Sequence, residues 1–352
     1  MKKYWSKRIQ ELEAYVPGEQ PKDRRYIKLN TNENPYPPSP KAIEAMSAAI
    51  GGEMRLYPDP ECTAVVEAVA SRYGIAKEQV FVGNGSDEVL AMCFPAFFDT
   101  DSTILFPDIT YSFYPVYADL YQVPYETVPL NEDFTVPVEA FLRPNGGIII
   151  ANPNAPTGIV LPLEAIERVA AGNPDSVVIV DEAYVDFGGD TALPLINKYP
   201  NVLVVRTTSK SYSLAGLRVG WAMGDKELIS ALNTVKNSIN SYTLDRIAIA
   251  GGAAAIADEE YFRSCCNKVI ATRERSIAAL TGLGFHCLPS STNFIFAAPE
   301  KMDAEELFGK LRERGILVRY FRKPRISGFL RISIGTDEEM DALIAAIGDM
   351  IG

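Results

Sequence analysis

The chain has 352 residues, more than a single hydrophobic core usually organises, so its length suggests two domains. Apolar residues make up 47% and charged residues 22%, which is the composition of a globular protein and excludes a disordered one. The formal net charge of -11 argues against a nucleic-acid-binding protein or one that docks on anionic membranes, because both need a basic face.

The N-terminus is basic and amphipathic, without the apolar run of a signal peptide, and no membrane-spanning apolar stretch occurs elsewhere. Five cysteines without a CxxC pair fit a reducing compartment better than a disulfide framework. His286 is the one histidine, which argues against a histidine-based zinc site or catalytic triad. We expect a cytoplasmic protein with no metal, no membrane segment and no nucleic-acid partner.

The first 40 residues, rich in Pro and Asn, are expected to form an arm. Between about residues 75 and 220, short apolar runs alternate with helical stretches, and each run ends in a polar or glycine cluster. The runs are QVFVGNGS (79–86), STILFPD (102–108), GGIIIANPN (146–154), SVVIVDEAY (176–184) and NVLVVRTTSK (201–210). They predict an α/β fold with a mainly parallel sheet between helices. Ligands of such sheets bind beyond the carboxyl ends of the strands.

After about residue 245 the pattern changes. It predicts a long helix over 258–283, an extended segment over 285–298, a helix over 302–315 and two short strands, ILVRYF (316–321) and GFLRISIG (328–335). This is the pattern of a smaller α+β domain. We therefore expect an arm at 1–40, a large domain at 41–245 and a small domain at 246–352.

The segment GNGSDEVLAMCF (83–94) places a glycine turn between a strand and a helix that opens at Ser86 and Asp87. Free N–H groups and the positive end of the helix dipole make such a helix start a phosphate cradle. The third glycine of a dinucleotide fingerprint is missing, because Glu88 occupies its place. The segment favours a phosphate ligand over NAD.

Three further residues follow apolar strands. Asp181 ends a buried run and needs a cation, such as a protonated pyridine nitrogen or a magnesium ion. Tyr184 follows it, and Lys210 comes after the next run. Singly, these residues have ordinary explanations, such as a solvated loop lysine. Together with the phosphate cradle, an amine, a carboxylate and a phenol form the set that binds pyridoxal phosphate.

The motifs NPNAPTG, DEAY and SKSYSLAGLRVG, in this order, are similar to those of the fold type I aminotransferases. The segments LNTNENPYPPSP, YPDP, GNGSDE, VRYF and LRISIGT resemble those of histidinol-phosphate aminotransferases. The resemblance extends over essentially the whole chain.

The resemblance implies that Lys210 carries pyridoxal 5'-phosphate as a Schiff base. Asp181 would pair with the ring nitrogen, Tyr184 with the ring hydroxyl, and Tyr111 would stack on the ring. The remaining cofactor contacts that it implies hold the phosphate, and they are Ser86, Asp87, Thr207, Ser209 and Arg218. Tyr57 would reach the phosphate of a neighbouring subunit, which implies a homodimer.

One position departs from the family pattern. The asparagine that usually precedes Pro-Thr-Gly is replaced by Ala155, and Asn154 stands before it. Either Asn154 contacts the ring hydroxyl through a shifted turn, or Tyr184 acts on that hydroxyl alone.

The implied reaction is transfer of an amino group between L-histidinol phosphate and 2-oxoglutarate. The substrate contacts would be Arg319, Arg331, Tyr15 and Asn32 or Asn34, with guanidinium groups suited to both carboxylate and phosphate. Alternatives are an aromatic or branched-chain aminotransferase and a related decarboxylase of phosphorylated amino acids. A pyridoxal-phosphate-binding regulator would need a DNA-binding domain, for which this acidic chain has no basic patch.

Overall fold

The computed structural model describes residues 3–351, and a seven-stranded sheet with the order β2-β8-β7-β6-β5-β3-β4 dominates it. Its strands are β2 (Val80–Asn84), β3 (Ile104–Pro107), β4 (Tyr125–Val128), β5 (Gly147–Ala151), β6 (Val178–Asp181), β7 (Val202–Thr207) and β8 (Val219–Gly224). Strands β7, β6, β5, β3 and β4 are parallel, whereas β8 is antiparallel to both neighbours. The predicted mainly parallel sheet is confirmed. Strand β8 runs the other way because the short connection over 208–218 carries no helical crossover.

Helices cover both faces of this sheet, and the alternation of side chains along the central strands separates two apolar clusters. Ile179 of β6 packs with α4 (Gly85–Phe97), α5 (Phe113–Tyr121) and α7 (Lys226–Ile239). Its neighbours Val178 and Val180 pack with α3 (Thr63–Tyr73), α6 (Leu163–Gly172) and α8 (Arg246–Ala257). The central strands are therefore buried on both faces, which explains their continuous apolar sequence.

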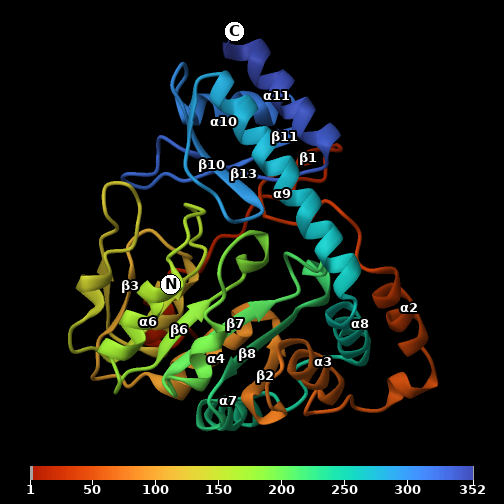
Figure 1. The fold of residues 1–352 in the computed structure, drawn as a ribbon, viewed down its shortest axis with the longest axis vertical. Coiled ribbons are helices and arrows are strands. Elements are labelled where there is room, and N and C mark those ends of the chain that lie inside the picture. The colour runs from red at the N-terminus through yellow and green to blue at the C-terminus, as the bar shows by residue number, and fades with distance from the viewer. Residues whose placement is uncertain (1–2, 352) are drawn as a thin grey trace.

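The C-terminal part forms a four-stranded antiparallel sheet with the order β12-β13-β10-β9. Its strands are β9 (Phe285–Cys287), β10 (Phe294–Pro299), β12 (Arg319–Tyr320) and β13 (Leu330–Ser333), and its helices are α9 (Glu259–Gly282), α10 (Ala304–Glu313) and α11 (Asp337–Ile351). This part lies at the top of Figure 1, and the long helix α9 runs down from it toward α8. The predicted smaller α+β part is confirmed.

The N-terminal arm is attached to the C-terminal part. It contains α1 (Lys7–Glu11) and β1 (Ile27–Lys28), and β1 pairs in parallel with β11 (Ile316–Leu317). The prediction of one strand over 316–321 was therefore wrong. The chain changes partner at the buried Val318, so β11 joins the arm and β12 joins the antiparallel sheet.

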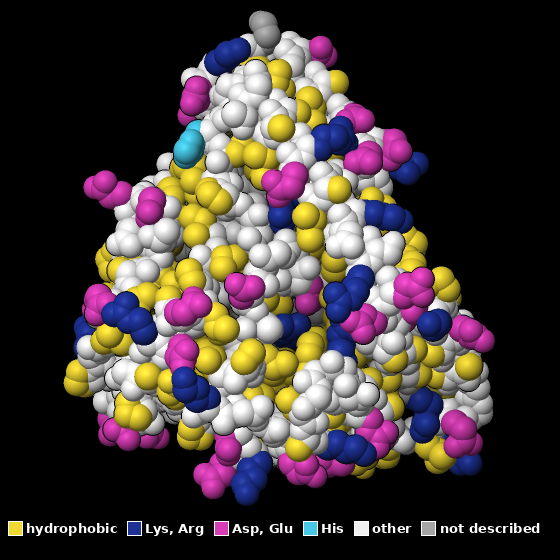
Figure 2. Space-filling view, viewed as in Figure 1, with side chains coloured by type: hydrophobic (Ala, Val, Ile, Leu, Met, Phe, Trp, Pro, Cys, Tyr) yellow, Lys and Arg dark blue, Asp and Glu magenta, His cyan; other side chains and the backbone are white. Residues whose placement is uncertain are grey.

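The remaining elements are α2 (Pro40–Ala49) and short 3-10 segments, η1 (Gly52–Arg55), η2 (Lys77–Gln79), η3 (Val138–Phe141), η4 (Val185–Phe187), η5 (Leu193–Asn197) and η6 (Ala215–Leu217). Over residues 3–351, no helix combines the length and apolar character needed to cross a membrane. Figure 2 shows acidic and basic side chains interspersed over one face of the molecule. His286 is exposed on β9, and all five cysteines are free thiols.

Candidate active site

A cavity lies beyond the carboxyl ends of β6 and β7, where the large sheet meets the loop 30–33 of the arm and the strands β12 and β13. Most of the predicted site residues line it. They are Tyr15, Asn32, Ser86, Asp87, Tyr111, Asp181, Tyr184, Thr207, Ser209, Lys210, Arg218, Arg319 and Arg331. Residues far apart in the sequence therefore surround one space.

One end of the cavity has the features of an anion site. Helix α4 begins at Gly85. The side chain of its N-cap residue, Asn84, accepts no hydrogen bond from the first turn, so the N–H groups there remain available to an anion. Arg218 reaches this end, where its Nη1 donates to Ser209 Oγ at 3.2 Å. Gly85 has a φ of +80°, and a Cβ there would lie 2.4 Å from Arg218 Nη2. Glycine at this position thus lets the guanidinium approach the helix start.

The hydroxyl groups at this end are linked to one another. Thr207 Oγ1 donates to Ser209 Oγ at 2.9 Å, and the backbone N–H of Ser209 donates back to Thr207 Oγ1 at 3.1 Å. A Cβ on Gly220 of β8 would lie 2.3 Å from the backbone nitrogen of Ser86, so only glycine lets β8 pass this close to α4. Helix start, hydroxyls and guanidinium together form a cradle for a phosphate group.

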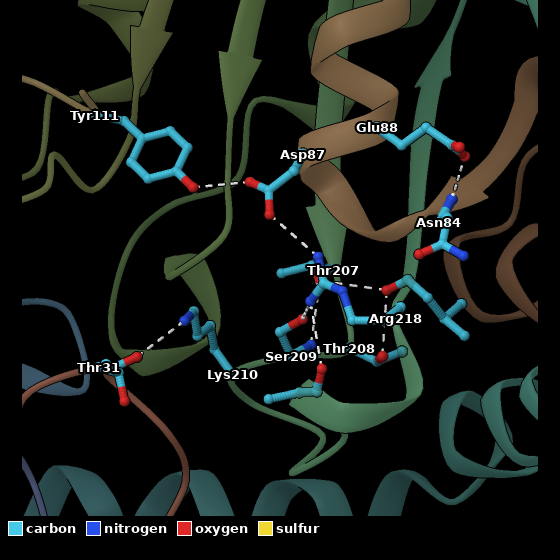
Figure 3. Close-up of polar contacts among 12 residues, drawn as sticks. Thr31, Asn84, Asp87, Glu88, Tyr111, Thr207, Thr208, Ser209, Lys210 and Arg218 are labelled. Carbon is cyan, nitrogen blue, oxygen red and sulfur yellow. Dashed lines mark hydrogen bonds and ion pairs between the residues drawn. The ribbon is translucent and has the colours of Figure 1, made fainter. Parts of the chain in front are cut away.

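Asp87 connects this cradle to Tyr111. The Tyr111 hydroxyl donates to Asp87 Oδ1 at 2.8 Å, and Arg218 Nη2 donates to Asp87 Oδ2 at 3.1 Å, as Figure 3 shows. Burial and the neighbouring Asp87 carboxylate raise the pKa of Tyr111, so its hydroxyl keeps its proton and acts as a donor. Because the carboxylate is occupied in this way, Asp87 can serve an anion only through its backbone N–H.

Asp181, the last residue of β6, is only 5% exposed. Oδ2 accepts the hydroxyl of Tyr114 at 2.8 Å, and Oδ1 accepts the N–H of Ala183 at 3.2 Å. Burial raises the pKa of Asp181 to about 6, although both hydrogen bonds act in the opposite direction. Within the described part of the chain no Lys or Arg forms an ion pair with it. Each oxygen retains a lone pair for a cationic donor in the cavity.

Lys210 follows β7, and its side chain extends away from the hydroxyl cluster toward Thr31 in Figure 3. Its Nζ donates to the Thr31 carbonyl at 3.4 Å and lies 5.7 Å from the centre of the Tyr184 ring. The Tyr184 hydroxyl accepts a hydrogen bond from Asn32 Nδ2 at 2.9 Å. The amine and the phenol therefore line the same part of the cavity.

Arg319 and Arg331 face each other on neighbouring strands β12 and β13. Arg331 Nη2 donates to the Asn30 carbonyl at 3.1 Å, while its buried Nε has no partner. Burial, and the charge of Arg319, lower the pKa of Arg331. Neither arginine forms an ion pair with an acidic residue anywhere in 3–351. The pair is therefore open to an anionic ligand.

Three predicted residues, Tyr57, Asn34 and Asn154, lie outside the cavity. Tyr57 is 79% exposed and stacks on Tyr242 with ring centroids 4.6 Å apart. Asn34 instead holds the loop that bears the candidate amine, since its Nδ2 donates to the Lys210 carbonyl at 3.0 Å.

Asn154 is buried and fully engaged within the protein. Its Nδ2 donates to the Ile109 carbonyl at 2.9 Å and to Thr157 Oγ1 at 3.0 Å, while its Oδ1 accepts the Thr110 hydroxyl. Ala155 lines the cavity at the neighbouring position. This arrangement favours the alternative in which Tyr184 acts on the ring hydroxyl without help from Asn154.

The sequence reasoning missed several residues of this region. Tyr114 stands in a tyrosine-rich segment, YSFYPVYADLY (111–121), where nothing in the sequence distinguishes it from a packing residue. A buried network was also missed, in which Arg206 bonds Glu182 at 2.9 Å and Asp186 at 3.1 Å. Ser211, next to Lys210, donates to Asp186 Oδ2 at 2.6 Å. A charged residue within the apolar run of β7 was the one available signal.

Comparisons with known proteins agree with this geometry. Residues 24–347 match the family model described as aminotransferase class I and II. The chain is 57% identical to a histidinol-phosphate aminotransferase of Pseudomonas syringae pv. syringae, over 99% of this chain and 100% of that protein. It is also 57% identical to histidinol-phosphate aminotransferase 2 of Dechloromonas aromatica, over the full length of both.

Among solved structures, that of histidinol-phosphate aminotransferase from Sinorhizobium meliloti, in complex with pyridoxal-5'-phosphate, superimposes with a TM-score of 0.88. It is 26% identical, covering 99% of this chain and 97% of the other. The matched region contains the candidate lysine, the buried aspartate and the phosphate cradle. The chain therefore belongs to the class I and II aminotransferases, which are enzymes that use pyridoxal phosphate.

Proposed function

We propose that this enzyme transfers an amino group between L-histidinol phosphate and 2-oxoglutarate. One observation carries the choice of substrate: Arg319 and Arg331, which have no acidic partner among residues 3–351, line the same cavity as Asp181 and Lys210. Two adjacent guanidinium groups suit a phosphate dianion, and one of them suits a carboxylate. The relatives that are named histidinol-phosphate aminotransferases support the same choice.

The residues of the cavity fit pyridoxal 5'-phosphate. The backbone N–H groups at Ser86 and Asp87 would bind its phosphate. Three side chains would do the same, those of Thr207, Ser209 and Arg218. Tyr111 would stack on the ring, and the Tyr184 hydroxyl would contact the ring hydroxyl. Asp181 is a buried carboxylate with free lone pairs, so a pyridinium N–H would satisfy it.

When bound, pyridoxal phosphate supplies an electron-accepting ring that stabilises the charge left when a substrate loses its α-proton. The carboxylate of Asp181 would stabilise a positive charge on the ring nitrogen. Lys210 Nζ would hold the cofactor through its aldehyde, and the amine would accept and return the α-proton of the substrate as general base and acid. Asn34 fixes the backbone of Lys210, which limits the positions that Nζ can reach.

The arm supplies the remaining substrate contacts. Tyr15 stacks on Phe113 of α5 with ring centroids 4.1 Å apart, which brings the arm against the cavity. Asn32 is 1% exposed and donates a hydrogen bond to the Tyr184 hydroxyl, so it would fix the position of that hydroxyl beside the substrate. Arg331 would bind the anionic group common to both half-reactions, and Arg319 would add the second contact that a dianion needs.

The enzyme is proposed to act as a cytoplasmic homodimer. Tyr57 is exposed together with Met54 and Leu56, its neighbours in the chain, and with Tyr242, on which its ring stacks. An exposed apolar surface of this kind suits a subunit contact. Five free thiols support a reducing compartment. The proposed division into an arm (1–40), a large domain (41–245) and a small domain (246–352) would place the cavity where all three meet.

Steady-state kinetics with both substrates test the function. With histidinol phosphate and 2-oxoglutarate varied together, we expect glutamate formation and the parallel double-reciprocal lines of a ping-pong mechanism. Turnover with phenylalanine but not histidinol phosphate would indicate the aromatic aminotransferase instead. Carbon dioxide release without 2-oxoglutarate would indicate the decarboxylase.

A further inference from the structure

Tyr114 is a buried hydrogen-bond donor aimed at the candidate ring-binding carboxylate. Its side chain on α5 is 0% exposed, and its hydroxyl donates to Asp181 Oδ2 at 2.8 Å. Its ring is held edge-on between Phe106 and Tyr111, with centroid distances of 5.8 and 5.7 Å. This packing holds the ring in place, with its hydroxyl directed at Asp181.

The direction of donation is defined by the electrostatics of this pair. Burial, together with the charge of Asp181 and the hydrogen bond to it, raises the pKa of Tyr114 well above its usual value, so the phenol keeps its proton. The carboxylate is exposed to further negative charge from Asp87 on α4 and from Glu182, which follows it in the chain. A neutral donor at 2.8 Å offsets part of this repulsion and makes the carboxylate a weaker base.

Tyr114 does not line the cavity, whereas Asp181 does. Its hydroxyl can therefore influence a ligand in the cavity only through the carboxylate, and Tyr114→Phe keeps the ring that packs against Tyr111. The other oxygen of Asp181 has just the longer N–H bond from Ala183, at 3.2 Å. Tyr114 is thus the stronger of the two donors that the carboxylate has within the protein.

We propose that Tyr114 is a positioning residue that determines where the proton shared by Asp181 and a bound pyridine ring resides. This inference rests on the proposed function, in which Asp181 faces the ring nitrogen. By stabilising the ionised carboxylate, the Tyr114 hydroxyl keeps the proton on the ring and so preserves its electron-accepting character. Without the hydroxyl, the carboxylate becomes a stronger base and the proton moves toward Asp181.

The size of the effect follows from the hydrogen bond. A hydrogen bond to a charged group changes an equilibrium by roughly 10- to 100-fold. Tyr114→Phe should therefore shift the sharing of the proton toward the carboxyl by about that factor. We expect the shift to lower kcat, while KM changes little because the substrate contacts are untouched.

Nitrogen-15 NMR of holoenzyme reconstituted with pyridoxal phosphate labelled at the ring nitrogen measures this directly. In Tyr114→Phe the ring-nitrogen signal should move toward the unprotonated form. Incorporation of 3-fluorotyrosine at position 114, whose hydroxyl is a stronger donor, should move it the other way or leave it fully protonated. Tyr117→Phe is the matched control, since this buried hydroxyl on the same helix donates to the Asp87 carbonyl and not to Asp181.

A second readout does not depend on the cofactor. Carbon-13 NMR of labelled aspartate in the apoprotein should show the midpoint of the Asp181 titration about one to two pH units higher in Tyr114→Phe than in the wild type. An unchanged midpoint and an unchanged ring-nitrogen signal would overturn the inference. If the wild type binds no cofactor through Lys210, the proposed function fails, while the apoprotein titration still decides whether Tyr114 controls Asp181.

Discussion

Arg319 and Arg331 lie directly opposite each other on β12 and β13, although like charges in this position repel. The Cζ atom of Arg331 lies 5.4 Å from the ring centroid of Phe294 and 5.5 Å from that of Phe321. Its buried Nε has no hydrogen-bond partner. Two adjacent cations that no acidic residue in the described part of the chain neutralises are best explained by an anionic ligand. The arrangement therefore points to how the two substrates are distinguished.

The two arginines should differ in their effects. Arg331→Ala should weaken both half-reactions, since each loses a charge-assisted contact of roughly 1.5–3 kcal/mol. Arg319→Ala should damage the histidinol phosphate half-reaction more than that of glutamate, because a carboxylate is satisfied by one guanidinium. Single-turnover rates with each donor measure this.

Arg322 provides the control. It lies three residues after Arg319, is exposed, and forms an ion pair with Glu305 of α10. Arg322→Ala should leave both half-reactions unchanged. Equal losses for the two donors in Arg319→Ala would contradict the role given to Arg319.

Lys210→Ala should abolish the visible absorption of the bound cofactor and essentially all turnover, because it is the lysine that lines the cavity. Lys226→Ala, on the exposed start of α7, should retain both. Borohydride reduction of the wild-type holoenzyme, followed by peptide mapping, identifies the labelled residue. A label on another lysine would show that the assignment is wrong.

The buried carboxyl of Asp181 should make the apoprotein less stable as the pH rises. Burial raises its pKa from 3.8 to about 6, so the folded state binds this proton more tightly than the unfolded state. The proton on Asp181 therefore adds to the free energy of unfolding. This stabilisation is fully present below about pH 4 and is lost as the pH rises through 6. The loss is ~3 kcal/mol, at 1.36 kcal/mol for each pH unit.

Asp181→Asn removes this dependence. The stability of the variant apoprotein relative to the wild type should increase between pH 4.5 and 7.5, as measured by urea denaturation. Adding pyridoxal phosphate should favour the wild type instead, because the ring supplies the missing cation. A constant difference across this pH range would show that the carboxyl is not the cause.

The network behind the active site should matter for stability. Arg206 is 5% exposed and holds the carboxylates of Glu182 and Asp186, so Arg206→Met would leave the buried Glu182 and the partly buried Asp186 without this cation. The expected loss is roughly 3–5 kcal/mol in the free energy of unfolding.

Arg143→Met breaks a solvent-exposed ion pair with Glu126 by the same substitution and should have a far smaller effect. Urea denaturation of both variants compares them. Similar losses would mean that the buried network does not stabilise the fold through its charges.

The sequence predicted those features that depend on local pattern. Asp181 ends one mainly apolar strand and Lys210 follows the next. Parallel strands bring their carboxyl ends to one edge of the sheet, so these residues could be placed together in advance. Features that depend on distant pairing could not be predicted. The division of 316–321 between β11 and β12 depends on β1, nearly 300 positions away, and Tyr114 is distinguished from other tyrosines only by where its hydroxyl points.

The most direct test of the proposed reaction is stopped-flow measurement of the cofactor absorbance of the holoenzyme after mixing with one amino donor at a time. We expect rapid, saturable conversion by histidinol phosphate and by glutamate, and little by phenylalanine. Saturation by phenylalanine without any response to histidinol phosphate would contradict the proposed function.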